Sequence, residues 1–70
     1  MRIYEFTLSH RGTNDKVKFI FPNYQDACRY GHKLEAYSSL LNGYTIRRMV
    51  ITKTGGAFHC DKILRHVRWH

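Results

Sequence analysis

The sequence predicts an α+β domain in which a four-stranded antiparallel sheet carries one helix on one of its faces, in the chain order β-β-α-β-β. Three observations lead to this prediction. Apolar and polar residues alternate in two segments at the start of the chain, as in half-buried strands. The middle of the chain has apolar residues at helical spacing, and alternating residues return after it. At 70 residues and without an internal repeat, the chain is predicted to form a single small domain, residues 1–70.

The first two segments are expected to form a hairpin. Residues 2–9 alternate, and the side chains predicted to face the core are Tyr4, Phe6 and Leu8. Residues 10–15 supply the Gly, Asn and Asp that turns prefer. Residues 16–21 alternate again, and their inward side chains are predicted to be Val17, Phe19 and Phe21. Pro22 lacks the N–H that a strand ladder needs, so it ends the second strand.

One helix is predicted over residues 24–41. Asn23 is suited to cap its N-terminus, with Asp26 three residues later in a position resembling a capping box. The apolar stripe that should face the sheet consists of Ala27, Tyr30, Leu34, Tyr37 and Leu41. Gly31 falls on the same stripe and would let the helix lie close to the sheet. Asn42 and Gly43 supply the stop signal.

Two more strands are predicted after the helix. Residues 44–53 form the third strand, the run TGGA forms a turn, and residues 57–60 form a short fourth strand. Residues 61–70 fit a short helix or a strand, and we expect an extended or irregular tail packed on the sheet edge. The simplest layout is the strand order 2-1-3-4 with a right-handed crossover through the helix.

Two adjacent arginines lie in the middle of the third strand. Neighbouring strand residues point to opposite faces, so Arg47 and Arg48 cannot both avoid the core side. The phase that places Tyr44, Ile46 and Val50 under the helix buries the bulkier set, and we prefer it. Arg48 then points toward the helix layer, where a bulge or a snorkelling guanidinium would relieve the cost of a buried charge.

A single helix covers only one face of the sheet, so the second face is predicted to be a binding surface. Cations and exposed aliphatic side chains mix on it: Ile3, Glu5, Lys16, Lys18, Ile20, Arg47, Met49, Ile51, Lys53 and His59. An apolar patch surrounded by charge on a soluble protein is typical of an interaction site. The predicted partner-binding residues on this face are Lys16, Lys18, Arg47, Met49, Ile51 and Lys53. Self-association of this face in a homodimer is the alternative to a monomer that binds another molecule.

The C-terminal tail is a second candidate contact. Arg68 could hold a phosphate and Trp69 could stack on a base. The alternative is that Trp69 fills the end of a small core while the cations around it are solvated.

Charge points to an acidic partner. The chain has 12 Lys and Arg against 5 Asp and Glu, and residues 36–70 carry only one of those carboxylates. Such a balance suggests a protein, DNA or RNA partner of negative charge, although it also suits plain solubility. No apolar stretch reaches the roughly 18 residues of a membrane span, and no signal peptide is expected, so we predict a cytoplasmic protein with no membrane contact.

Catalytic and metal sites are not predicted. Cys28 and His32 have i,i+4 spacing, but both are expected on the outer side of the helix, and no CxxC pair is present. The two cysteines are expected to be reduced. No sequence pairing suggests a nucleophile with its base. We therefore predict a protein that is not an enzyme, with no cofactor and no structural metal.

In layout and in a few residues, the chain resembles small phage-encoded anti-CRISPR proteins, in particular a compact type I-F inhibitor family. The resemblance rests on the stretch GYTIRRMVI after the helix and on the late Arg68-Trp69 pair. It implies a helix on an antiparallel sheet, no catalysis, and binding to a CRISPR surveillance complex in the host cytoplasm. The alternative is a small sequence-tolerant DNA- or RNA-binding regulator or recombination accessory protein.

Overall fold

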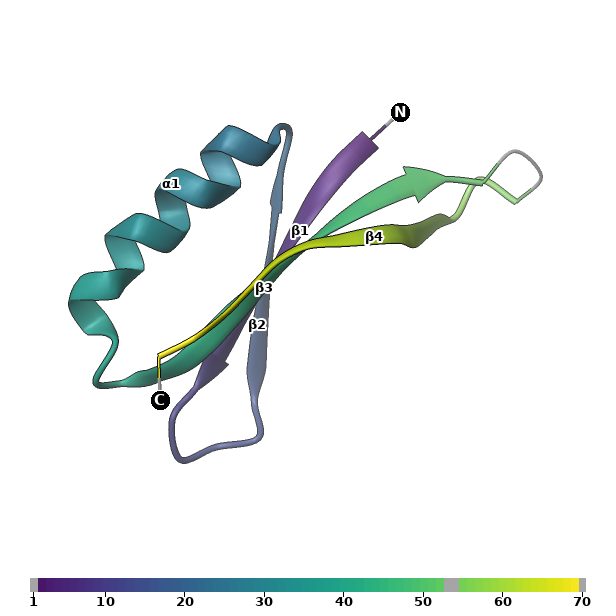
Figure 1. Ribbon diagram of the computed structural model, residues 1–70. Helices are drawn as coiled ribbons and strands as arrows, with labels where there is room; N and C mark the ends of the chain where they lie inside the picture. The colour runs from purple at the N-terminus through teal and green to yellow at the C-terminus, as the bar shows by residue number, and fades with distance from the viewer. Residues whose placement is uncertain (1, 53–54, 70) are drawn as a thin grey trace.

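The computed structural model describes residues 2–52 and 55–69 of the chain. It contains four strands and one α-helix: β1 (Arg2–His10), β2 (Lys16–Phe21), α1 (Tyr24–Leu34), β3 (Leu41–Ile51) and β4 (Phe58–Arg68). The strands form one antiparallel sheet in the order β2-β1-β3-β4, and α1 lies on one side of it (Figure 1). The predicted fold class and strand order are confirmed.

The alternation of the first two strands is confirmed by their register. Phe6 faces Phe19 across the hairpin, and on its other side it faces Ile46 of β3. Phe6 and Ile46 are fully buried, and Leu8 is nearly so. The inward positions of the three strands therefore meet under α1, where they form the core.

The core is unusually aromatic for so small a domain. The Phe6 ring stacks on Tyr44 with 4.6 Å between centroids, and Tyr30 of α1 packs edge-on against both Phe6 and Phe19 at 5.1 Å. Aromatic rings bury a large apolar area each, so few residues suffice to cover the sheet. Ala27 and Gly31 are the buried residues of α1, and their small size lets the helix come close to these rings.

The helix begins at the predicted residue, Tyr24, but it ends before the predicted C-terminal residue. Asn23 caps it, because its Oδ1 accepts from the Asp26 backbone N–H at 2.8 Å and its Nδ2 donates to the Asp26 carboxylate at 3.0 Å. The prediction of a helix reaching Leu41 is wrong, since α1 ends at Leu34 and a 3₁₀ turn, Glu35–Tyr37, follows. Leu41 pairs with His10 as the first residue of β3. The apolar residues keep helical spacing as far as Leu41, but strand pairing with the end of β1 overrides that local preference.

The phase predicted for the third strand is confirmed, although β3 covers residues 41–51 rather than 44–53. Tyr44 and Ile46 are buried under α1, and Arg48 is on the same face because it pairs with Tyr4. Arg47 lies on the opposite face, where it pairs with Glu5.

The prediction of a short fourth strand and an irregular tail is wrong. β4 is one strand of 11 residues that pairs with nearly the whole of β3. Its register shifts twice, opposite Ile46/Arg47 and opposite Arg48/Met49, so Leu64 and Asp61 are extra residues in the ladder. Bulges of this kind reverse the alternation downstream of them, which is why a simple period-two reading of residues 57–70 does not find the strand.

The paired ends of β3 and β4 project past the helix. Figure 1 shows α1 along one half of the sheet, while the ends of β3 and β4 continue away from it, with the start of β1 paired to β3 through Val50. We call residues 48–51 and 58–62 the arm. Its two faces are both left open by α1, and they carry different side chains, as described below.

Candidate functional site

The open face is the side of the sheet opposite α1, and the register brings together most of the residues predicted for it. Lys16 and Lys18 come from β2, and Arg47, Met49 and Ile51 come from β3. Arg68 joins them from β4, where it pairs with Gly43. Lys53 lies outside the described residues.

Two other predicted positions differ in the structure. His59 pairs with Val50, so it lies on the helix side of the sheet, which corrects its predicted place on the open face. Trp69 is also on the helix side, half-buried, with its ring 5.5 Å from Tyr44. Its backbone N–H donates to the Asn42 carbonyl at 2.9 Å. Of the two alternatives for Trp69, the structure shows the one in which it fills the end of the core.

Sequence reasoning missed four residues of the open face, all in β4. Phe58, Cys60, Ile63 and His66 pair with outward-facing residues of β3. Phe58 adds an aromatic side chain to the open face. A usable signal was the absence of Gly and Pro from residues 57–70, which is compatible with one long strand.

The open face is divided into an apolar end and a basic end. The apolar end lies toward and on the arm, and its side chains are Ile3, Ile20, Met49, Ile51, Phe58, Cys60 and Ile63. Ile20 is 57% exposed and Ile63 is 59% exposed, so this end is largely open to solvent. The basic end lies beside the β1–β2 turn, and its side chains are Lys16, Lys18, His66 and Arg68.

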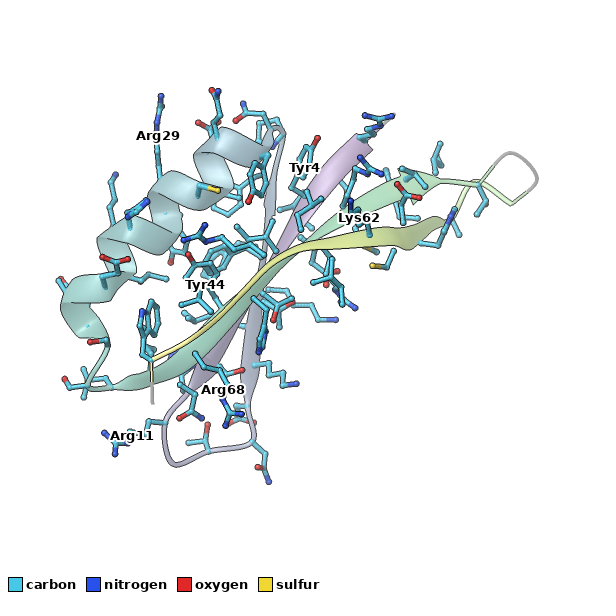
Figure 2. The ribbon with its side chains drawn as sticks, viewed as in Figure 1. Tyr4, Arg11, Arg29, Tyr44, Lys62 and Arg68 are labelled. Carbon is cyan, nitrogen blue, oxygen red and sulfur yellow. The ribbon has the colours of Figure 1, made fainter. Side chains whose placement is uncertain are left out.

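A shallow hollow of about 310 Å³ adjoins the basic end. It is lined by strand residues that include Ser9, Thr45, His66 and Arg68. Thr45 Oγ1 and His66 Nδ1 are 2.9 Å apart, and this hydrogen bond holds the imidazole across β3 and β4. Figure 2 shows Arg68 on the side of the sheet away from α1, and its side chain is exposed.

Glu5 and Arg47 form an ion pair at the centre of the open face. Glu5 is only 9% exposed, although it lies on the outer side of the sheet, because Arg47 covers it. Arg47 donates to one carboxylate oxygen of Glu5, and Thr7 Oγ1 donates to the same oxygen at 3.3 Å. Arg47 is therefore committed to a neighbour within the sheet rather than free for a partner.

The surroundings of Glu5 shift its pKa. Burial raises the pKa of the Glu5 carboxyl, but the Arg47 hydrogen bond and the charges of Arg47 and Lys18 outweigh burial, so its pKa lies below the ordinary value of 4.5. The pKa of Arg47 is raised, mainly by its hydrogen bond to Glu5. Each partner thus favours the charged form of the other.

We expect this pair to make the protein less stable in acid. Because the pKa of Glu5 is lowered by folding, its contribution to stability is complete above the unfolded value of 4.5 and is lost as the pH falls through the folded value. Chemical denaturation between pH 7 and pH 2 should show this loss, and it should be smaller in Glu5→Gln. Asp15→Asn removes an exposed carboxylate of the turn and should keep the wild-type loss. A loss in Asp15→Asn that is reduced as much as in Glu5→Gln would contradict the assignment to Glu5.

Arg48 is paired on the helix side of the sheet. Its Nε donates to Asp61 Oδ2 at 2.7 Å, and Asp61 is one of the two extra residues that the register shifts introduce into β4. The shift thus supplies the carboxylate that a half-buried guanidinium needs. The expected bulge beside the arginine pair is present, on the neighbouring strand.

The cysteines and histidines do not converge. Cys28 packs at the margin of the core, so its predicted place on the outer side of α1 is wrong, whereas His32 is exposed and lies 3.6 Å from a Glu35 oxygen. Within residues 2–52 and 55–69, no three His, Cys, Asp or Glu side chains are grouped as a metal site would require. No helix in the described part of the chain is long and apolar enough to span a membrane.

Comparison with known proteins adds no family to this description. No protein-family model, no curated protein and no solved structure matches the chain. The chemistry of the two sheet faces is therefore the basis for inferring function.

Proposed function

We propose that the protein is a non-enzymatic inhibitor whose open face docks onto a host protein or nucleoprotein complex. A CRISPR surveillance complex is the target that the sequence resemblance suggests. The observation that carries the proposal is the apolar end of the open face, where Ile20 and Ile63 expose more than half of their surface beside charged neighbours. Exposed apolar side chains grouped with cations are typical of protein interfaces.

The division of the open face favours a protein over bare nucleic acid as the partner on this side. A nucleic-acid backbone would use Lys16, Lys18 and Arg68, but it would leave the apolar end in water. A protein surface with an apolar patch next to acidic groups would match both ends. Arg47 joins the two ends as part of a neutral pair, so it adds little net attraction for a polyanion.

Ile63 is the residue from which we expect most of the binding free energy. It lies midway along the edge strand β4, where it pairs with Arg47, and its apolar neighbours toward the arm are Cys60 and Met49. Central residues that become fully desolvated usually cost about 2 kcal/mol or more on truncation, whereas charged residues at the rim mainly change the association rate.

The test is inhibition of target-DNA cleavage by a purified type I-F surveillance complex. Ile63→Glu places a charge in the apolar end and should weaken inhibition by about thirtyfold or more, on that scale of hot-spot energies. Leu40→Glu is the matched control. Leu40 is 66% exposed and lies on the helix side, next to Phe19 and Tyr30, so this variant should inhibit like the wild-type protein. Circular dichroism melts of both variants check that each is folded.

Three results would contradict the proposal. The wild-type protein could fail to bind or inhibit the complex at micromolar concentration, or Ile63→Glu could inhibit as well as wild type. Analytical ultracentrifugation provides the third, since a wild-type dimer that Ile63→Glu converts to a monomer would assign the open face to self-association.

A further inference from the structure

We infer that the helix side of the arm is a second binding surface, and that its ligand is the phosphate backbone of duplex DNA. This surface, the cationic arm surface, consists of Arg48 and Lys62 of the arm together with two adjoining residues, Arg2 of β1 and Arg65 of β4. It lies on the opposite side of the sheet from the open face and shares no residue with it.

The register shifts of β4 create this surface. Arg65 pairs with Ile46, Lys62 with Arg48 and His59 with Val50, so these three residues of β4 face the helix side although they are three positions apart. Strict alternation would have sent Lys62 to the opposite face from Arg65 and His59. The same shifts send Ile63 and Cys60 to the open face. The two bulges therefore sort the cations of β4 from its apolar residues.

Neighbouring strands complete the surface. Arg2 pairs with Val50 at the start of β1, which puts it in the same row as His59. Figure 2 shows Lys62 on the arm beyond α1, on the same side of the sheet as Tyr4. Four guanidinium or ammonium groups are gathered there, with Asp61 as the carboxylate among them.

The cations differ in how firmly they are held. Arg65 Nε donates to the Tyr44 hydroxyl at 3.1 Å, and Arg48 is fixed by Asp61, so the inner half of the surface is preorganised. Arg2 and Lys62 are exposed, and neither side chain forms a hydrogen bond or ion pair with another described residue. These two are available for phosphate contacts.

The spacing suits a duplex. Rows on one face of a strand are about 6.7 Å apart, and neighbouring strands are about 4.8 Å apart, so the cations span roughly 13 Å along β3. B-form DNA presents one charge for about every 1.7 Å of its axis, so several phosphates lie within reach. The arm projects beyond α1, which leaves room for the duplex (Figure 1).

Duplex DNA is favoured over a single strand because the aromatic rings on this side are occupied. Single-stranded binding uses exposed rings on which bases stack. Tyr4 packs against Tyr24 with 6.2 Å between centroids, and both belong to the margin of the core. The surface offers charge without a stacking platform, so it should contact the backbone with little sequence preference.

The experiment measures fluorescence anisotropy of a labelled 20-base-pair duplex of arbitrary sequence with the full chain, across a salt series. Arg2→Ala/Lys62→Ala removes two phosphate contacts. The slope of log affinity against log salt should become less steep by about 1.8, and affinity at 0.15 M salt should fall about thirtyfold. Arg29→Ala/Lys33→Ala removes the same charge from exposed positions of α1, and its affinity should fall less than threefold.

Several outcomes would overturn the inference. If the α1 double variant loses as much affinity as the arm double variant, binding reflects net charge only. If the unlabelled single strand competes better than the duplex, the surface is not a duplex site. If anionic vesicles bind with the same dependence on Arg2 and Lys62 while DNA does not bind, the ligand is a membrane. Inhibition of the surveillance complex is read separately with the Ile63 variant, so either proposal can fail without the other.

Discussion

Arg47→Ala is expected to lower the free energy of unfolding by about 3 kcal/mol, because it leaves the Glu5 carboxylate shielded from water without its partner. Breaking a buried ion pair by removing one member typically costs about 3–5 kcal/mol, and the partial exposure of Arg47 places this case at the lower end. In a domain of this size that loss corresponds to a fall in Tm of roughly 12–24 °C.

The control for this prediction removes both charges. Glu5→Gln/Arg47→Met has no unpaired carboxylate and keeps most of the side-chain volume, so it should recover most of the lost stability. Lys18→Ala removes an exposed cation from the neighbouring strand and should change stability by less than about 1 kcal/mol. A melting temperature for Arg47→Ala equal to that of wild type would show that Glu5 does not depend on Arg47.

The ion pair with Glu5 gives Arg47 a role in stability at the open face, where the sequence predicts a role in binding. From the sequence, Arg47 is the cation expected to bind the partner most strongly, with little effect on stability. In the structure its guanidinium is bound to Glu5, so a loss of partner binding in Arg47→Ala would include a loss of folded protein. Ile63 is the better probe of the open face, because it is exposed and no charge depends on it.

Gly31→Ala is expected to destabilise the protein by about 2 kcal/mol, although alanine favours helices over glycine by about 1 kcal/mol. A methyl group at this position would lie 2.5 Å from the Tyr44 hydroxyl oxygen and 2.6 Å from its Cζ. Tyr44 cannot move aside easily, because its ring is stacked on Phe6 and its hydroxyl accepts from Arg65. Either the ring or α1 must shift, and both belong to the core.

A double-mutant cycle separates this clash from other effects of the substitution. Tyr44→Leu removes the ring atoms that the methyl group would meet, so Gly31→Ala/Tyr44→Leu should be no less stable than Tyr44→Leu alone. Gln25→Ala, at an exposed position of α1, should change stability by less than about 0.5 kcal/mol. Thermal and urea denaturation provide the measurements, and additivity of the two substitutions would contradict the proposed contact.

The sequence by itself determined the parts of the fold that follow from short-range patterns. Strict alternation in residues 2–9 and 16–21 placed Phe6, Leu8 and Phe19 on the inner face. When one face of a sheet is covered, only one phase of an alternating strand buries its apolar side chains. The Asn23 cap and the small residue Gly31 determined where α1 begins and which side meets the sheet. The phase of β3 followed from the bulk of Tyr44 and Ile46.

The tertiary structure decided where α1 ends and where β4 runs. The chain leaves the helix early because Leu41 must pair with His10, a partner 31 positions away that helical spacing does not reveal. β4 carries two extra residues whose positions depend on β3, so its alternation cannot be followed from its own sequence.

The same long-range pairing decided which charges are free to bind. Glu5 and Arg47 are far apart in the chain, and only the register between β1 and β3 makes them an ion pair. The register between β3 and β4 likewise divides the basic residues between two faces, with Arg68 on one and Lys62 on the other. Composition predicted a cationic protein, but cross-strand neighbours set the surface each cation occupies, because side-chain direction in a sheet depends on strand pairing and bulges.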